Sequence, residues 1–430
     1  MATRYQKGSG KASELIGAGA RWPVPEVGEA LEELVRRGAQ AMLRRALEEE
    51  VEAFLGRGRY HREGEFRGYR NGHAPERTVG SGLGSVAVRA PRVRDVPPEV
   101  APEGYRSALL PRYQRRTPAQ SRLFAQLYLE GLSSGDFEPV FRALLGEDAP
   151  LSASTMLRLK DAWKLEYETW QQRPLGDRQY AYLWLDGIYL GCGQEREKTV
   201  LLCVLGAAED GTKELLALEE GYRESTASWQ GVLRSLRERG MAPPLLAMGD
   251  GGLGAWAALT EVFPSTRHQR CWNHRVLNVQ DQLPKRLQGE ARKELRALWE
   301  APTRVECEVR RDQYVAQLRR QGQEAAAATV LRDWEDFVAF YDFPQEHWLH
   351  LRTTNAIESV FAGVRLRTNV AKRMGKRENA LYLVFKLVGR LGQNWRALNG
   401  GRTVMCLVLD GRRFVDGILQ GKEGQTQAAA

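Results

Sequence analysis

The stretch Tyr180-Ala-Tyr-Leu-Trp-Leu-Asp186-Gly187 decides the fold of this chain. Six apolar or aromatic residues follow one another without alternation and end at a single carboxylate. A run this short indicates a strand that is buried on both faces, although the run alone also fits a buried helical segment. The strand-rich sequence that follows favours the strand and predicts that Asp186 ends it. Taken alone, an aspartate before Gly187 is more often a turn residue than a metal ligand.

The sequence after this strand predicts a mixed α/β layer. Apolar runs at residues 199–205 and 214–218 follow after short turns, which indicates an antiparallel meander. A helix over 225–240 comes next, and the strand 244–248 then ends in Gly249-Asp250-Gly-Gly252. The predicted order is therefore β-β-β-α-β, with one acid closing the first strand and another closing the fourth. A helix over 253–263 and a short strand over 266–271 extend the layer.

The region before the layer combines helices with a basic ribbon. Apolar residues at three- and four-residue spacing predict a helix over 26–56. In the basic segment 57–94, Asn71-Gly72 indicates a hairpin turn and 85–89 alternates as a strand does. Arginines on such a ribbon, among them Arg67 and Arg70, would contact a DNA duplex, although a solvated basic hairpin fits as well. This ribbon is therefore a candidate nucleic-acid interface.

Residues 117–170 are typical of a helix-turn-helix DNA reader. A helix over 120–130, a short turn, a second helix over 137–145 and a Ser/Thr-capped helix over 156–170 follow in order. Arg158 lies in the last of these helices and is a candidate DNA contact. A generic three-helix bundle gives the same pattern, and Pro139 inside the second helix weakens the recognition unit.

Composition limits the class of protein. The chain has 430 residues and a formal net charge of +9, which favours a polyanionic partner or serves solubility alone. Its five cysteines form no CxxC pair, which indicates a reducing compartment. Neither a signal peptide nor a membrane span is visible in the sequence. We expect a soluble cytoplasmic protein that does not use a membrane.

Three acids stand where the predicted fold converges: Asp186, Asp250 and Glu358, the last at the start of a later helix. Clustered carboxylates repel one another, and a divalent cation removes that conflict. Oxygen ligands favour Mg²⁺, or Mn²⁺, over zinc. Two such ions about 3.5–4 Å apart can support an in-line phosphoryl displacement. The motif Asn355-x-x-Glu358 also resembles a capping box, a role that a metal ligand can fill at the same time.

The helix that begins near Glu358 is basic and carries no acid before Glu378. This pattern favours a phosphate-contacting surface beside the metal site over an ordinary solvated face. Its candidate DNA contacts are Arg365, Arg367, Lys372, Arg373, Lys376 and Arg377. Trp348 is a candidate for stacking on an unpaired base, although tryptophans in this region are more often core. Cys271 and His274 offer two ligands where a structural zinc site needs four, so we interpret them as a structural pair.

Four blocks in order make the sequence resemble the Mutator-type family of bacterial insertion-sequence transposases. They are Asp186-Gly-Ile-Tyr189, Gly249-Asp250-Gly-Gly252, Arg270-Cys271-Trp-Asn-His274-Arg275, and Thr353-Thr-Asn-Ala-Ile-Glu358-Ser359. The resemblance runs from about Leu31 to Trp395. It implies that Asp186, Asp250 and Glu358 hold two Mg²⁺ ions for cleavage and strand transfer at terminal inverted repeats. It also implies a homodimer acting on double-stranded DNA, in association with the bacterial nucleoid.

The family resemblance also implies the domain organisation. The fold class is α/β, with a ribonuclease-H-like core interrupted by an all-helical insertion. The predicted segments are a tail (1–25), a helix and basic hairpin region (26–116), a helix-turn-helix-like domain (117–172), the first part of the core (173–275), the insertion (276–349), the second part of the core (350–400) and a C-terminal segment (401–430). Two rival functions are a structure-selective nuclease of the same fold and a DNA-binding regulator without catalytic activity.

Overall fold

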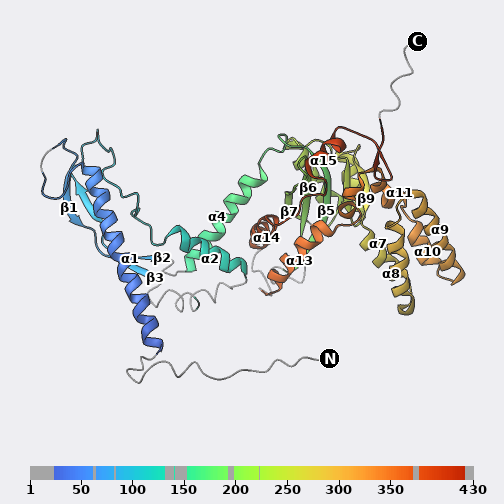
Figure 1. The fold of residues 1–430 in the computed structure, drawn as a ribbon, viewed down its shortest axis with the longest axis horizontal. Coiled ribbons are helices and arrows are strands. Elements are labelled where there is room, and N and C mark those ends of the chain that lie inside the picture. The colour runs from blue at the N-terminus through green and yellow to red at the C-terminus, as the bar shows by residue number, and fades with distance from the viewer. Residues whose placement is uncertain are drawn as a thin grey trace, which may run out of the picture. The chain divides into compact units, whose positions relative to one another are not determined.

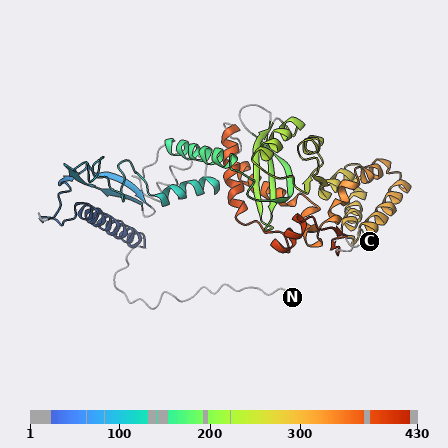
Figure 2. The same ribbon diagram turned by 90° about the horizontal axis from the view of Figure 1, so that it is seen from above.

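The computed structural model describes residues 24–61, 64–81, 84–130, 140, 153–191, 198–221, 223–370 and 377–421 (Figure 1, and from above in Figure 2). The chain divides into two compact units. The first comprises residues 1–128 and 132–153, and the second comprises residues 129–131 and 154–430.

The first unit begins with a long helix, α1 (Val24–Leu55), where the apolar spacing predicted one. The carboxyl-terminal half of α1 buries Leu47 in a small cluster that includes Val88 of the ribbon. In the amino-terminal half the predicted apolar stripe is not covered, because Leu31 and Leu34 are exposed. The sequence therefore predicted the helix correctly but not how little of its stripe the unit itself buries.

Two small antiparallel sheets form the ribbon, and their strands are β1 (Tyr69–His73) with β4 (Pro91–Arg94), and β2 (Arg77–Ser81) with β3 (Gly84–Val88). The strand predicted over 85–89 is confirmed as β3. The hairpin turn predicted at Asn71-Gly72 is wrong, because both residues lie inside β1. The β1–β4 register shifts between Arg70 and His73, and Gly72 has φ +60°. A strand irregularity thus uses the positive φ that the pattern assigned to a turn.

The helix-turn-helix prediction is tested only at its flanks. The helices expected there are present as α2 (Pro118–Glu130) and α4 (Ala153–Gln171). The middle helix of the prediction lies, apart from residue 140, outside the described residues, and so does Pro139. The recognition unit therefore stays a prediction.

The second unit is built on a five-stranded sheet of order β7-β6-β5-β8-β9. Its strands are β5 (Tyr180–Gly191), β6 (Lys198–Ala208), β7 (Lys213–Gly221), β8 (Leu246–Gly249) and β9 (Arg267–Arg270). β5, β6 and β7 form the predicted antiparallel meander, while β8 and β9 run parallel to β5. The β-β-β-α-β order is confirmed, because helix α5 (Thr226–Glu238) separates β7 from β8.

The prediction that β5 ends at Asp186 is wrong. Parallel pairing with β8 stops at the pair Trp184 and Met248, but pairing with β6 continues to Gly191. Asp186 lies opposite Cys203 in that continuing ribbon. The strand continues because β6 still supplies backbone partners after β8 has ended.

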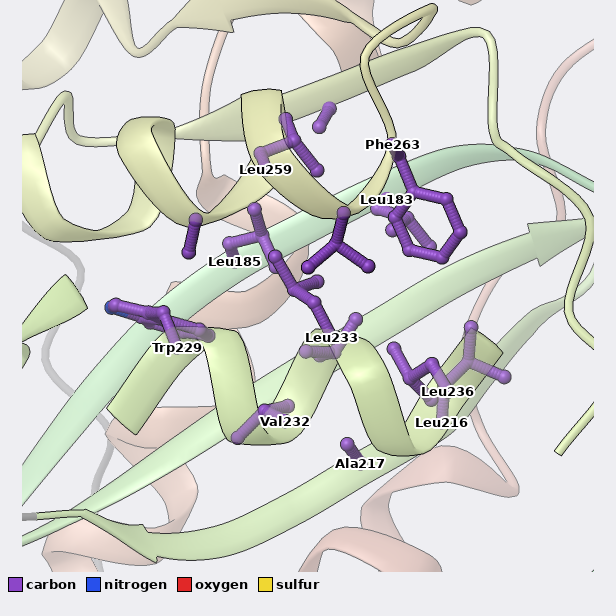
Figure 3. Packing of buried hydrophobic residues seen from close by; sticks show 14 of the residues in the cluster. Leu183, Leu185, Leu216, Ala217, Trp229, Val232, Leu233, Leu236, Leu259 and Phe263 are labelled. Atoms are coloured by element: carbon purple, nitrogen blue, oxygen red, sulfur yellow. The ribbon is translucent and has the colours of Figure 1, made fainter. Parts of the chain in front are cut away.

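One face of the sheet is covered by α5 and by α6 (Leu253–Val262). Trp229, Leu233 and Leu236 of α5 point into a buried cluster with Leu183 and Leu185 of β5 (Figure 3). Strand residues two apart share a face, so Gly187 belongs to this side of β5 as well. The other side of β5 carries Tyr182, Trp184 and Asp186.

The segment between β9 and α13 (Asn355–Val370) is helical throughout. Its elements are α7 (Trp272–Gln280), α8 (Lys285–Trp299), α9 (Arg304–Arg320), α10 (Glu324–Leu331), α11 (Glu335–Val338), the 3₁₀ turns η1 (Ala339–Asp342) and η2 (Gln345–His347), and α12 (Trp348–Leu351). Tryptophans 299 and 334 pack around Trp272, with ring centroids 5.4 and 5.8 Å away. The aromatic residues of this segment thus form a core.

The chain returns to the sheet through α13, which packs on β5, and α14 (Arg377–Gly392), which packs on β7. The helix α15 (Gly401–Leu409) and the pair β10 (Phe414–Val415) and β11 (Ile418–Leu419) were not predicted. In the described part of the chain, no helix has both the length and the apolar character to cross a membrane.

Candidate active site

Asp186 sits on β5 just beyond the end of its parallel partner. It shares a face with Tyr182 and Trp184, whose polar atoms bond to His347 and to the backbone of His350. Asp186 Oδ1 accepts a hydrogen bond of 2.8 Å from the Gly187 amide. The strand therefore aims this carboxylate at the helical side of the sheet, towards α12 and α13.

Asp250 follows β8 directly, as the sequence predicted. Its Oδ1 accepts from the Gly252 amide at 2.8 Å, which closes an Asx-type turn into α6. Gly251 has φ +92°, a conformation that favours glycine, and its carbonyl accepts from Arg270 at 3.2 Å. The Gly-Asp-Gly-Gly stretch is thus a fixed turn that presents one carboxylate at the end of the sheet.

Glu358 lies in the first turn of α13, also as predicted. The capping box predicted for Asn355 is wrong in its details, because the Glu358 amide donates to the Thr354 carbonyl and the Thr354 hydroxyl donates to Glu358 Oε1. The Asn355 side chain accepts instead from Asn273 of α7 at 2.8 Å. Thr354 therefore begins the helix, and Asn355 ties it to α7.

Cys271 and His274 connect α7 to the start of α13. The buried Cys271 sulfur accepts from the Thr354 amide at 3.3 Å and lies 3.1 Å from the Thr354 hydroxyl oxygen. His274 Nδ1 lies 3.7 Å from Glu358 Oε1, too far for a hydrogen bond, and has no hydrogen-bond partner among the described residues. The structural-pair interpretation stays a prediction, and the contacts place an imidazole beside Glu358.

The electrostatics join these groups into one cluster. Burial, together with the charges of Asp250 and Glu224, raises the pKa of Asp186 to about 7, while the Gly187 amide and the charge of His274 act to lower it. The Cys271 side chain, with the charges of Glu358 and Asp250, raises the pKa of His274 to about 9. Asp186 is thus coupled to Asp250, and His274 is coupled to all three predicted acids.

Glu224, which the sequence analysis missed, is a fourth carboxylate of this cluster. It precedes Ser225, the N-cap residue of α5, and accepts a hydrogen bond from the Tyr189 side chain. Burial raises the pKa of Glu224, and the charge of Asp250 adds to that rise. The sequence signal was weak, because an acid before a Ser/Thr cap is common at helix starts.

The donor set fits a divalent cation of the Mg²⁺ class. Asp186, Asp250, Glu224 and Glu358 all offer carboxylate oxygens, and burial with the neighbouring acids Asp250 and Glu224 makes the charged form of Asp186 unfavourable without a cation. In the described part of the chain, one group of three ligating side chains has its ligand atoms within 4.8 Å of one another, namely Cys271, His274 and Glu358. The three predicted acids do not share that spacing, as expected of like charges without a cation between them.

The residues predicted to contact DNA from α13 and α14 differ in their exposure. Arg365 is exposed, with its guanidinium 5.9 Å from the Phe361 ring centre. Arg377 is exposed at the start of α14, 3.8 Å from Glu220. The other predicted lysines and arginine of this stretch lie outside the described residues; they are Lys372, Arg373 and Lys376.

Two predicted DNA contacts are wrong. Arg367 is buried, and its Nε donates to the Leu129 carbonyl at 2.8 Å. Its guanidinium therefore bonds within the protein. Trp348 is 3% exposed, donates to the Phe343 carbonyl at 2.9 Å and packs edge-on against Tyr341. A tryptophan so enclosed cannot stack on a base. Side-chain direction on a helix or turn, which sequence spacing left open, decided both outcomes.

The remaining candidates lie outside the sheet region. Arg70 is half-buried and pairs with Glu48 and Glu52 of α1, so its charge is held within the first unit. Arg67 is partly exposed and lies 3.2 Å from Glu65. Arg158 is exposed on α4. DNA contact by Arg158, Arg67 and Arg70 therefore stays a prediction, and Arg70 would have to leave its pairs with α1 to make it.

Comparison with known proteins identifies the family. The model of the Mutator family of transposases matches residues 16–397. The chain belongs to the Mutator family of transposases. It is 43% identical over 299 residues to the transposase for insertion sequence element IS6120 of Mycolicibacterium smegmatis, covering 70% of this chain and 92% of that protein.

More distant relatives extend the similarity over most of the chain. The transposase for insertion sequence element IST2 of Acidithiobacillus ferrooxidans is 41% identical over 280 residues, which cover 64% of this chain and 93% of that protein. The transposase for ISRM5 of Rhizobium meliloti is 28% identical over 379 residues, which cover 86% of this chain and 90% of that protein. The similarity to these two transposases thus reaches well beyond the four blocks that suggested the family.

Proposed function

We propose that this Mutator-family protein is a DNA transposase that binds the terminal inverted repeats of an insertion sequence and catalyses metal-dependent strand cleavage and strand transfer. The observation that carries the proposal is the convergence of Asp250, Asp186 and Glu358 on one electrostatic cluster around His274. The strand order, with a three-stranded meander followed by two parallel strands, supports a ribonuclease-H-like core. The exposed Arg365 and Arg377 support a DNA path beside it.

Asp186, Asp250 and Glu358 would hold two Mg²⁺ ions, or Mn²⁺, in this proposal. Bound cations of this kind activate an attacking hydroxyl and neutralise the charge that develops on the leaving oxygen. The protein's own part is to fix the three carboxylates on a strand, a turn and a helix end, and to place His274 beside Glu358. With a pKa raised to about 9, His274 is protonated at pH 7 and offers a positive charge near the scissile phosphate.

The proposed chemistry has two steps, and each step is a displacement at the phosphorus of a DNA phosphodiester. In the first, water attacks phosphorus, a new P–O bond forms, the bond to the 3′ oxygen breaks, and that oxygen leaves as a hydroxyl with a proton. In the second, this 3′-hydroxyl attacks a phosphate of the target duplex and displaces the target's own 3′ oxygen. Neither step changes an oxidation state.

The protein would act as a homodimer, so that two element ends are held together. The exposed apolar residues Leu31, Leu34 and Met42 of α1 support an association between copies. Sedimentation of the purified protein with and without DNA tests this part separately.

The deciding experiment uses labelled duplexes of the DNA at each end of the gene, incubated with protein and Mg²⁺. We expect cut and joined products, and their loss by at least about 1,000-fold in Asp250→Asn with DNA affinity retained. Asp210→Asn, at the other end of the same sheet, is the matched control and should cut normally. Cutting without joining would instead indicate a nuclease, and binding alone would indicate a regulator. Normal cleavage by Asp250→Asn would refute the site.

A further inference from the structure

Glu224 reaches the cluster from the opposite face of the sheet to Glu358. By alternation along β5, Asp186 faces α12 and α13, whereas Gly187 faces α5 and α6. Glu224, at the entrance to α5, lies directly over Gly187. Two carboxylates from opposite sides of β5 therefore approach the same end of the strand pair β5–β8.

Two glycines make room for Glu224. A Cβ added at Gly187 would lie 2.5 Å from Glu224 Oε1 and 2.8 Å from its Cδ. A Cβ added at Gly254 of α6 would lie 2.4 Å from the Glu224 carbonyl oxygen. Real Cβ contacts are essentially never this short, so a side chain would force the Glu224 carboxylate to move at Gly187 and the backbone to move at Gly254. Gly187 follows Asp186, and Gly254 follows the Asp250 turn, so the two proposed catalytic acids are each followed by a glycine that receives Glu224.

Among the described residues, the neighbours of Glu224 fix its direction, and His274 is the positive charge that partly offsets its own. Tyr189, two residues beyond Gly187 on β5, hydrogen-bonds to the carboxylate. The charged groups that act on it are Asp250, which raises its pKa, and His274, which lowers it. A buried carboxylate with a like charge beside it is costly unless a cation joins it. A purely structural contact to Tyr189 could be made by glutamine at lower cost.

From this placement we propose that Glu224 is a fourth carboxylate of the divalent-cation site and takes part in binding the cation that Asp186 and Asp250 hold. The proposal rests on the proposed function, because it presupposes that these acids bind Mg²⁺ or Mn²⁺. It adds a ligand, direct or through water, from the α5 side of the sheet. Gly187 then has a defined part, which is to let that carboxylate reach the ions.

The test is Mn²⁺ binding by the full-length protein without DNA, followed by electron paramagnetic resonance of the free ion. We expect Glu224→Gln to weaken binding of at least one Mn²⁺ by about 10-fold or more, as loss of groups around a metal does. Glu238→Gln, an exposed carboxylate at the far end of α5, should bind Mn²⁺ as the wild type does. Glutamine keeps the size of Glu224 and can accept from Tyr189, so the thermal midpoint without metal should not fall.

Gly187→Ala provides a second variant that keeps every charge. Its methyl group would push the Glu224 carboxylate aside, so it should weaken Mn²⁺ binding in the same direction. If it acts through Glu224, adding it to Glu224→Gln should cause little further loss. Fully additive losses would overturn the role assigned to Gly187.

The variant Asp250→Asn distinguishes failure of the fourth-ligand proposal from failure of the proposed function. If Asp250→Asn weakens Mn²⁺ binding and Glu224→Gln does not, the fourth-ligand proposal is overturned and the proposed function stands. If neither variant changes Mn²⁺ binding, both fail together. Weaker binding in both, with Glu238→Gln unchanged, supports the proposal.

Discussion

The two ends of the five-stranded sheet use their acids in opposite ways. At the end where β5 begins, Arg178 lies 3.0 Å from Asp210 and 3.3 Å from Glu214, and Arg173 lies 2.7 Å from Glu214. At the end where β8 stops, the charges of Asp186, Asp250 and Glu224 act on one another, and His274 acts on these acids and on Glu358. The first end is an ion-pair network and the second is a set of like charges.

The carboxylates at the two ends of the sheet have pKa shifts of opposite direction. The Thr212 hydroxyl hydrogen bond, with Arg178, lowers the pKa of Asp210. Burial and neighbouring acids raise the pKa of Asp186 to about 7. A fold tolerates unpaired carboxylates only where something else offsets their repulsion. The comparison therefore points to the β8 end as the cation-binding end.

The largest expected effect concerns the dependence of stability on pH. The Asp186 pKa is raised in the folded state, so its penalty is absent below about pH 4, grows as pH rises to about 7, and is fully present above. Asp186→Asn removes it and should be more stable than the wild type at pH 8 by on the order of 2–4 kcal/mol, with no difference near pH 4. Urea unfolding at both pH values measures this, and saturating Mg²⁺ should shrink the difference.

Asp210→Asn is the opposite case at the other end. The Asp210 pKa is lowered, so its stabilisation is present above its ordinary pKa and is lost as pH falls. The variant should therefore be less stable than the wild type at pH 8, and the difference should vanish in acid. The same pH dependence in both variants would remove the distinction between the two ends.

The next largest effect is expected from removing the side chains that connect α7 to α13. Removing the imidazole in His274→Ala, or the sulfur in Cys271→Ala, should lower the rate of strand cleavage about 10–100-fold, because Glu358 loses its neighbour or its support. DNA affinity should stay near that of the wild type. Cys406→Ala, a cysteine outside the cluster, is the control.

The pH profile distinguishes a positioning role for His274 from simple loss of folding. In the wild type the cleavage rate should fall as pH rises through about 9, where His274 loses its proton. That decline should be absent in His274→Ala. An unchanged profile would mean that the imidazole charge plays no part.

A smaller effect on stability is expected at the end of the sheet where β5 begins. Arg173 bonds to Glu214 and to the Leu215 carbonyl, both at 2.7 Å, and stacks on Trp170. Arg173→Ala should lower the free energy of unfolding by about 1–3 kcal/mol. Mn²⁺ affinity should be unchanged, and a clear loss of it would show that the two ends are coupled.

The smallest effect separates two arginines of α13. Arg365→Ala should weaken DNA binding by about 3–10-fold and reduce the slope of log affinity against log salt by about 0.9. Arg367→Ala should leave that slope unchanged and lower stability, because it removes a buried guanidinium and leaves the partly buried Leu129 carbonyl without its donor. Equal salt slopes in the wild type and Arg365→Ala would exclude a phosphate contact at Arg365.

The sequence by itself determined the order of the elements and the positions of Asp250 and Glu358. Hydrophobic runs and turn residues are local signals, so they gave the meander, the crossover helix and the helical segment without knowledge of the fold. These local signals failed where one pattern fits two structures. Asn71-Gly72 fits a strand irregularity as well as a hairpin turn. The apolar run before Asp186 did not indicate that pairing with β6 prolongs β5.

Only the tertiary structure decided which charged groups face one another. Glu224 lies far along the chain from Asp250 and became part of the cluster because Gly187 and Gly254 leave space for it. Arg367 turned inwards because Leu129, which is distant in the sequence, supplies a carbonyl acceptor. Trp348 is enclosed by Tyr341 and donates to the nearby Phe343 carbonyl. Burial and charge act through distance in three dimensions, and spacing along a chain does not specify that distance.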